Sequence, residues 1–358
     1  MKKLLKQAVG IDVAKDELVA TFGKKYEDLS YQLVSTTVFS NTKTGMVKLK
    51  KWTDKLKQLD KPVFYVMEAT GVYHELLAYY LVDNLQTVNI VLPSKISNYV
   101  KTLEIKTVND STSSSAIAQF GLDRKLDVWQ KPKPVYKKLR QLTRERDQIV
   151  EERTIVKNKL HADTKEADPN SSGLKRMKAR INLLNIQETQ IKKEIDVLIQ
   201  SNDELIEAID NISSIKGISK MVAAIILAET NGFELIRNKK QLVSYSGLDI
   251  IDKSSGTSVR SKPRISKRGN KYIRKALFFP SIVSVKWNKT HINLYERISV
   301  KSGIKKKGLT AVQRKLLELS YILFKNKTKF DDQYEIKQLQ KKEGEKFQPS
   351  LQPAIIAT

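Results

Sequence analysis

The sequence contains no cysteine among its 358 residues. This absence excludes disulfide bonds, zinc sites built on thiolates and cysteine nucleophiles. Histidine is also scarce, because His74, His161 and His291 are the only three and they lie far apart without the spacing of metal ligands. We expect these histidines at the surface or in the core. Catalysis, if the protein is an enzyme, must then use carboxylates or hydroxyl groups.

The chain lacks any apolar run that approaches the ~20 residues of a membrane-spanning helix. Its first residues are basic but lead straight into a predicted strand, which is not the pattern of a secretory signal. We therefore expect a cytoplasmic protein that is associated with the nucleoid when active. The hydrophobic content of 40% is sufficient for two or three folded domains.

Acidic residues are few relative to basic ones. The 65 Lys and Arg exceed the 39 Asp and Glu, and the formal net charge is +26. This charge is far larger than solubility requires, so it indicates a polyanionic partner. Nucleic acid is the expected partner. A membrane surface is a weaker candidate, because the basic residues are spread through segments with the pattern of folded structure.

Strand and helix patterns alternate over residues 1–128, which predicts an α/β domain with a mixed sheet. The expected strands are 7–12, 18–22, 31–39, 63–68 and 88–92. The expected helices are 44–59, 73–85 and 113–121. Antiparallel pairs come first and strand-helix-strand units follow. This order suits a ribonuclease-H-like arrangement, and ligands in such sheets collect at the strand ends.

Three carboxylates occur where predicted strands stop: Asp12, Glu68 and Asp110. Each of them taken alone is more simply a helix cap or a solvated loop residue. All three together in a strongly basic chain favour one acidic site at a sheet edge. Oxygen ligands of this kind bind Mg²⁺, and two such ions can stabilise the attacking and leaving oxygens of a phosphodiester displacement.

A linker with two prolines, 129–134, closes the first domain, and two long helical segments follow it. Their apolar residues recur every three or four positions, and Arg146, Arg153 and Glu188 occupy the same seam. The two helices therefore form a hairpin or an intermolecular coiled coil. A structural arm and a nucleic-acid-binding arm fit this pattern about equally.

A glycine-containing turn near Gly217 separates two predicted helices. Hairpins of this kind can present backbone amides to a DNA phosphate, although a simple packed helical turn fits as well. A further helix is expected at 310–324. Residues 331–358 are rich in Gln, Lys and Pro, and this composition predicts a mobile tail.

The densest basic stretch lies between residues 253 and 275 and contains no acidic residue. We expect its cations to contact nucleic acid: Lys253, Arg260, Lys262, Arg264, Lys267, Arg268, Lys271 and Arg274. Within this stretch, residues 254–258 form a Ser/Gly loop that can hold a phosphate through amide and hydroxyl groups. A serine there can also attack phosphorus if a base or a metal-bound group takes its proton. Loop flexibility alone explains the composition too.

The chain resembles the DEDD-type insertion-sequence transposases, relatives of the Piv and MooV DNA invertases that include the bridge-RNA-guided recombinases. The resemblance covers about residues 7–330. It is carried by these ordered motifs: Gly10-Ile-Asp-Val-Ala-Lys15, Glu68-Ala-Thr-Gly-Val-Tyr73, Asn109-Asp110, Ile215-Lys-Gly-Ile218, Tyr245-Ser-Gly-Leu248, Ser255-Gly256 and Ile265-Ser-Lys-Arg-Gly269.

The resemblance implies a domain order. A RuvC-like, ribonuclease-H-like metal-binding domain at 1–128 is followed by a linker and coiled-coil arm at 129–210. A mainly α transposase domain with a helix-hairpin-helix-like turn at 211–330 and a flexible tail at 331–358 complete the chain. The family's acidic residues fall on Asp12, Glu68 and Asp110, and its catalytic serine falls on Ser255.

One position departs from the family pattern. The fourth acid should follow three residues after the third, but Ser113 stands there. A hydroxyl brings no negative charge, so the affinity for a second ion should fall. The protein then manages with three acids, recruits Asp16 or Asp123, or is catalytically impaired.

The implied activity is RNA-guided DNA recombination during transposition. Asp12, Glu68 and Asp110 would bind Mg²⁺, Ser255 would attack a DNA phosphate, and Arg260 and Arg264 could neutralise the transition state. The implied partners are DNA, a structured noncoding guide RNA and further copies of the chain in a dimer or tetramer. A junction-resolving Mg²⁺-dependent nuclease and a non-catalytic nucleic-acid-binding protein are the alternatives.

Overall fold

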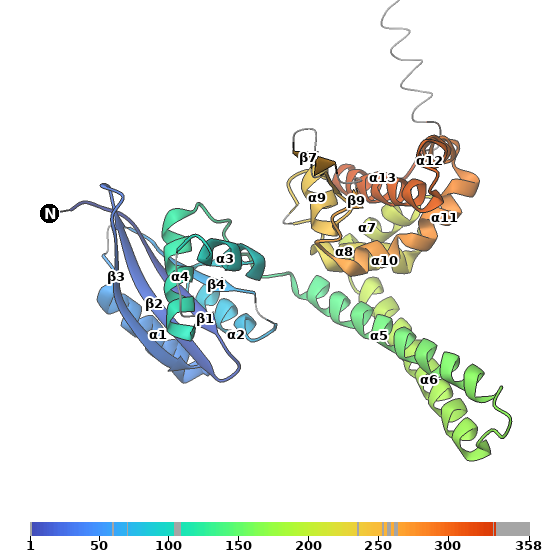
Figure 1. Ribbon diagram of the computed structural model, residues 1–358, viewed down its shortest axis with the longest axis horizontal. Helices are drawn as coiled ribbons and strands as arrows, with labels where there is room; N and C mark the ends of the chain where they lie inside the picture. Colours follow the sequence, from blue (N-terminus) through green and yellow to red (C-terminus); the bar gives the residue numbers. More distant parts are fainter. Residues whose placement is uncertain are drawn as a thin grey trace, which may run out of the picture. The chain divides into compact units, whose positions relative to one another are not determined.

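The chain, seen in a computed structural model, forms two compact units, Met1–Lys131 and Pro132–Thr358 (Figure 1). The structure describes residues 2–58, 61–69, 71–103, 109–234, 236–252, 254–255, 259–260, 264–331 and 333. The expected tail at 331–358 lies outside the described residues, apart from 331 and 333.

The first unit is built on a five-stranded mixed sheet. Its strands in spatial order are β3 (Tyr31–Ser40), β2 (Glu17–Tyr26), β1 (Leu4–Val13), β4 (Val63–Glu68) and β5 (Thr87–Val91). Pairing is antiparallel between β1, β2 and β3 and parallel between β1, β4 and β5. This order fits the predicted ribonuclease-H-like domain.

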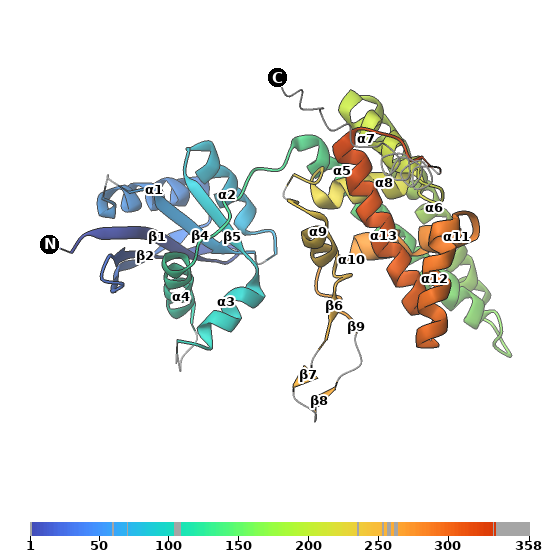
Figure 2. The same cartoon turned by 90° about the horizontal axis from the view of Figure 1, so that it is seen from above.

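Helices cover both faces of the sheet, so its central strands are apolar on both sides (Figure 2). They are α1 (Lys43–Leu56), α2 (His74–Asp83), α3 (Pro93–Val100) and α4 (Asp110–Asp123). The side chains of Val9 and Ile11 pack into the core under α1 and α2. Those of Val66 and Ile117 pack into the second core, on the side of α3 and α4.

Gly10 sets how closely α4 approaches the sheet. A Cβ at Gly10 would lie 2.1 Å from the backbone nitrogen of Ala118 and 2.4 Å from the carbonyl oxygen of Ser114. The backbone of α4 therefore rests directly on β1, and no larger residue fits at this position.

The sequence-based boundaries of unit 1 need two corrections. The helix expected at 113–121 begins three residues earlier, because Asn109 and Thr112 cap each other's backbone amides in a capping box. The helix α3 was not predicted. Pro93 occupies its first turn, where the missing amide proton has no partner to lose.

The second unit contains two 30-residue helices and a set of shorter elements. The helices are α5 (Pro134–Asp163), α6 (Ser171–Gln200), α7 (Asp203–Ser213), α8 (Lys220–Thr230), α9 (Lys239–Ser246), α10 (Lys271–Ala276), α11 (Phe278–Trp287), α12 (Lys289–Ser302) and α13 (Lys305–Asn326). The two-residue strands are β6 (Ile250–Ile251), β7 (Ser254–Ser255), β8 (Val259–Arg260) and β9 (Arg264–Ile265).

The helices α5 and α6 pair along their length as an antiparallel hairpin, here called the arm (Figure 1). Its predicted charged seam is real: buried Glu188 accepts hydrogen bonds from Arg146 at 3.0 Å and from Arg153, and pairs with Lys192 at 2.9 Å. Burial alone would raise the pKa of Glu188, but these hydrogen bonds and charges lower it to about 2.

One hydrophobic core joins the arm to the shorter helices. It runs from Tyr136 and Leu139 at the base of α5 to Leu316 and Leu323 of α13. The arm therefore belongs to the same unit as the C-terminal helices, whereas the sequence analysis gave it a segment of its own. None of the helices in the described part of the chain is both long enough and apolar enough to cross a membrane.

We predict that Gly10→Ala lowers the free energy of unfolding of unit 1 by about 3 kcal/mol, because the methyl group must push α4 away from β1. Denaturant unfolding followed by circular dichroism measures this loss. Gly173→Ala in α6 is the control, since its Cβ would meet nothing closer than 3.6 Å. Equal stability of the two variants would contradict the close packing.

Candidate functional site

Two of the predicted acids end neighbouring parallel strands. Asp12 is the next-to-last residue of β1 and Glu68 is the last residue of β4. The register pairs Ile11 with Met67, so Asp12 and Glu68 follow side by side at the same sheet edge. Side chains alternate between faces, and both carboxylates share the face of Gly10, which α4 covers.

The third acid reaches this edge through the direction of α4. Ser114 and Ala118 lie over Gly10, whereas Gly121 lies against Ala8 and Val66. The helix therefore runs antiparallel to β1, and its first residue, Asp110, extends beyond Gly10 toward the end of the strand that carries Asp12. The structure thus brings the three predicted acids to one end of α4.

The three carboxylates carry like charges that repel one another. Burial raises the pKa of Asp12 above its ordinary value, and the negative charges of Asp110 and Glu68 raise it further. A divalent cation would remove this repulsion, and carboxylate oxygens are the donors that Mg²⁺ and Ca²⁺ prefer. The donor set therefore fits a hard divalent ion. Within the described ranges, no three such side chains already surround a common point, so binding would require them to turn inward.

The fourth position, Ser113, lies in the first turn of α4, where its amide donates to the carbonyl of Asn109. The suggestion that Asp123 replaces the missing acid is wrong. Asp123 is the last residue of α4, about 20 Å along the helix from Asp110. Its carboxylate accepts hydrogen bonds from Lys25 at 2.7 Å and from the Tyr99 hydroxyl at 2.5 Å.

Asp16 and Asn41 lie at the same edge as the acids. Asp16 is in the turn between β1 and β2, directly after the strand end that carries Asp12, and remains a candidate for a further ligand. Asn41 was not singled out from the sequence. Its amide donates to the carbonyl of Ala14 at 3.0 Å and to that of Tyr73 at 3.2 Å, so it ties the β1–β2 turn to the segment before α2.

Ser255 lies in a small antiparallel hairpin of the second unit, here called the serine hairpin (residues 250–265). The backbone of Ser255 pairs with Val259, and Ile250 pairs with Ile265 at the base. Ser255 is therefore close to the hairpin tip. Lys253, Gly256 and Lys262 lie outside the described residues, as do the side chains of Ser255 and Arg260.

Two transposase family models match the chain. A model for DEDD transposases of the IS110 type, described as a transposase, matches residues 9–167, and one described as the IS116/IS110/IS902 transposase family matches residues 209–296. Together these ranges span more than half of the sequence. The chain belongs to this transposase family. The predicted resemblance is thereby confirmed.

Whole-length relatives are found among DNA-inverting proteins. The pilin gene-inverting proteins of Moraxella bovis and Moraxella lacunata are each 28% identical over 331 residues, which is 91% of this transposase and 98% of each relative.

The solved structures are more distant. RuvC of T. thermophilus with a Holliday junction substrate gives a TM-score of 0.27 at 7% identity, covering 34% of this chain and 99% of RuvC. A Ppx/GppA family protein of Aquifex aeolicus gives 0.22 at 10% identity, covering 96% and 99%. Such scores carry no structural argument, so the strand order alone supports the ribonuclease-H-like assignment.

Glu229 is a buried residue that was not singled out from the sequence, and it contacts residues on both sides of the serine hairpin. The Glu229 side chain is 1% exposed and forms a two-point ion pair with Arg144 of the arm, with distances of 2.7 and 2.8 Å. Asn270, after the hairpin, donates to the same carboxylate at 2.5 Å. The hydroxyl of Tyr245, before the hairpin, donates to the Glu229 carbonyl at 2.7 Å. These contacts fix the hairpin base to the arm.

The basic residues of the 253–275 stretch divide into two groups. Arg274 donates to the backbone carbonyls of Ser246 and Gly269, and Lys275 pairs with Asp147 and Glu151, so these two cations are used within the fold. Lys267 and Arg268 are exposed. Sequence alone could not separate the groups, because the carbonyls that accept from Arg274 belong to the end of α9 and to the loop before α10.

His291 is not placed to act as a catalytic base at the protein surface. His291 is 2% exposed, and its Nδ1 lies 2.5 Å from the hydroxyl of Ser284, which is completely buried. This pair is a core hydrogen bond between α11 and α12, so a substrate phosphate has no access to it. His291 therefore has the core role that the sequence analysis allowed.

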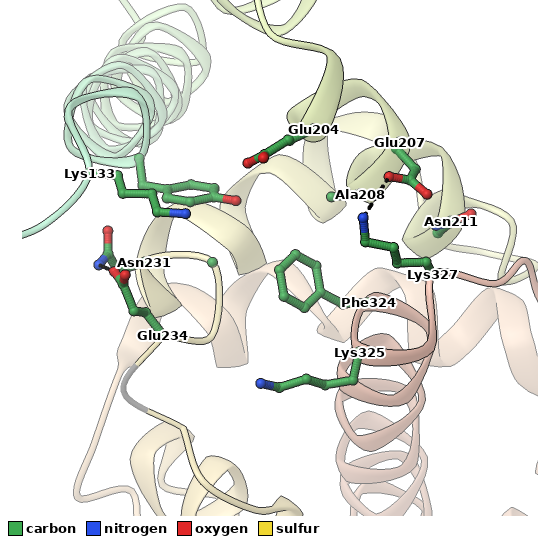
Figure 3. Close-up of a pocket in the computed structure, with 12 residues that line it drawn as sticks. Lys133, Glu204, Glu207, Ala208, Asn211, Asn231, Glu234, Phe324, Lys325 and Lys327 are labelled. Carbon is green, nitrogen blue, oxygen red and sulfur yellow. Dashed lines mark hydrogen bonds and ion pairs between the residues drawn. The ribbon is translucent and has the colours of Figure 1, made fainter.

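A pocket of about 330 Å³ lies among α7, α13 and the turn after α8 (Figure 3). Its acidic and basic side chains are equal in number. Glu207 is paired with Lys327 at 3.6 Å, and Glu234 accepts a hydrogen bond from Asn231 at 2.6 Å. The remaining charged lining residues are Glu204, Lys133 and Lys325. With three charges of each sign, the pocket has no electrostatic preference for a polyanion.

Asp12→Asn is predicted to stabilise the first unit by on the order of 1 kcal/mol at pH 7, because it removes a repelled charge. The folded-state pKa of Asp12 is raised, so its ionisation costs stability as pH rises from about 4 through the raised pKa. Comparing urea unfolding of wild type and variant at pH 4 and pH 7 measures this difference. Mg²⁺ should stabilise the wild type and not the variant.

Asp123→Asn is the matched control for this prediction. Burial raises the pKa of Asp123, but Lys25 and Tyr99 outweigh burial and hold the pKa below its ordinary value. This variant should lose about 1–2 kcal/mol at pH 7 and keep its response to Mg²⁺. A loss of stability in Asp12→Asn would show that the three acids do not repel one another.

Glu229→Gln is predicted to cost about 2 kcal/mol, because Arg144 loses its charged partner while its own 45% exposure lets water replace part of the interaction. Amide hydrogen exchange at residues 245–270 should rise with it. Glu318→Gln is the control, since its pair with Arg314 at 3.0 Å is more exposed and should be worth less than about 1 kcal/mol. Equal effects would remove the anchoring role from Glu229.

Proposed function

We propose that this protein is the DNA recombinase of an insertion sequence, and that it exchanges strands through a covalent serine–DNA intermediate under the guidance of a structured noncoding RNA. Asp12, Glu68 and Asp110 would hold Mg²⁺, and Ser255 would be the nucleophile. The observation that carries the proposal is the gathering of three mutually repelling carboxylates at one end of α4, in a chain with a net charge of +26.

The proposed step conserves the number of phosphodiester bonds. The Ser255 hydroxyl oxygen forms a bond to phosphorus while the bond from phosphorus to one deoxyribose oxygen breaks, and the serine proton ends on that leaving oxygen. The reverse step, with a hydroxyl of another strand as attacker, joins the new strand and frees the serine. Strand exchange therefore requires no external energy source.

The acidic site would assist this step by chemistry that serine lacks. Bound to these carboxylates, a divalent cation would supply positive charge for the developing phosphorane and for the deprotonated oxygen. Ser255 has no histidine near it in sequence, so the proposal places a carboxylate of the first unit within reach of the serine proton in the DNA-loaded assembly. Arg264, at the hairpin base, would neutralise phosphate charge.

The DNA partner is supported by the family and by the relatives. The family models are those of transposases, and the two Moraxella proteins are named for inverting a gene. The chain has 65 basic and 39 acidic residues, and this positive excess favours binding of polyanions such as DNA and RNA. A homo-oligomer, a dimer or tetramer, would supply the several active sites that exchange between two duplexes requires.

A nuclease that resolves DNA junctions with metal-activated water is the second candidate. It is favoured by the observation that all three acids belong to the first unit. In that case Ser255 would only bind phosphate.

Ser255→Ala is predicted to reduce strand exchange by at least about a thousand-fold and to abolish a denaturation-resistant protein–DNA adduct. The full chain is purified with its copurifying RNA and mixed with labelled DNA from the flanks of its gene, and denaturing gels measure the adduct. Ser254→Ala, at the adjacent residue, should keep both activities. Full strand exchange by Ser255→Ala would favour the nuclease instead.

A further inference from the structure

A groove of about 710 Å³ lies between the base of the serine hairpin and the helices α12 and α13. Its volume is within the range of sites that hold small molecules, roughly 300–1,000 Å³. Ile250 and Ile265, which pair at the hairpin base, form one wall, and Leu294 and Ile298 of α12 form another. Ile250 is 63% exposed, so the groove presents apolar surface to the solvent.

The lining of this groove is strongly basic. The cations are Arg264, Lys267, Lys306, Lys307, Arg314 and Lys315. The groove has one acid, Glu318, and Arg314 holds it at 3.0 Å. The groove therefore combines a clear positive excess with apolar side chains, unlike the balanced pocket at Glu207 and Lys327.

This combination fits one kind of occupant. An unpaired nucleotide has an apolar base face, which apolar side chains and planar guanidinium groups can contact, and phosphates on both sides for the cations. An apolar peptide has no negative charges that could pair with the six cations. A base in a duplex is stacked between its neighbours, so it enters such a groove only after it has been flipped out.

We propose that this groove captures the base of an unpaired nucleotide and so orients the strand that meets Ser255. The inference rests on the proposed function, because the groove wall is the base of the hairpin that carries Ser255. Glu229, which pairs with Arg144, also accepts hydrogen bonds from Tyr245 and Asn270 on either side of the same hairpin. A base held at Ile250 and Ile265 thus fixes the adjoining phosphate relative to the hairpin.

The test uses the full chain and a 20-nucleotide single strand with a central 2-aminopurine, and the same strand in a duplex. The groove variant is Ile250→Ser with Ile304→Ser, since both side chains are exposed, at 63% and 47%, and the fold should tolerate the change. Val300→Ser is the matched control, because Val300 is 84% exposed on α12 and does not line the groove.

We expect the groove variant to bind the single strand about ten-fold more weakly, which is the scale of losing one base contact. Its 2-aminopurine fluorescence change should also be lost, and its duplex affinity should stay within about two-fold of wild type. The control should match wild type throughout. Equal single-strand binding by groove and control variants would overturn the proposal, as would an equal loss for strand and duplex.

Two further measurements separate this inference from the proposed function. Ser255→Ala should capture the base like wild type, because the described lining of the groove comes from the hairpin base and from the region of α12 and α13. Absence of a serine adduct together with a groove-dependent affinity would refute the serine mechanism and keep the groove. Displacement of the bound 2-aminopurine strand by a synthetic apolar peptide, but not by unlabelled single-stranded DNA, would refute base capture.

Discussion

The contact between the backbone of α4 and Gly10 is the constraint on which the acidic site depends. Because no side chain separates helix from strand, α4 lies at a fixed depth and in a fixed direction over β1. The alternation of β1 and β4 then turns Asp12 and Glu68 toward the helix, and the Asn109 cap starts the helix at Asp110. Asp12, Glu68 and Asp110 come from three elements and lie near one another because Gly10 has no side chain.

The two units use buried charge in opposite ways. In the first, burial and then the nearby charges of Asp110 and Glu68 raise the pKa of Asp12, so its ionisation costs stability and a bound cation would offset that cost. In the second, the carboxylates of Glu188 and Glu229 are matched by arginines and stabilise the arm and the hairpin base. Crowded like charge therefore marks the candidate site in the first unit, whereas arginine-paired carboxylates support the fold of the second.

The sequence predicted the sheet and two of the three acidic positions well, because Asp12 and Glu68 directly end β-branched and aromatic runs. It could not place Asp110 over Asp12, since that depends on the direction in which α4 crosses β1. The proposal for Asp123 failed because thirteen residues of helix carry it to the opposite end. Glu229 was overlooked at the end of an apolar helix, because its partners Arg144 and Asn270 are 85 and 41 residues away.

The charged seam of the arm also has a mechanical consequence. Glu188 pairs with Arg146 and Arg153 on the opposing helix. Sliding α6 by one turn, about 5.4 Å, would therefore leave the Glu188 carboxylate without these partners in an apolar seam. The arm thus behaves as a rigid lever roughly 45 Å long, the length of a 30-residue helix. Arg144 joins this arm to Glu229, whose contacts with Tyr245 and Asn270 flank the hairpin that bears Ser255, so the arm and the hairpin base form one connected structure.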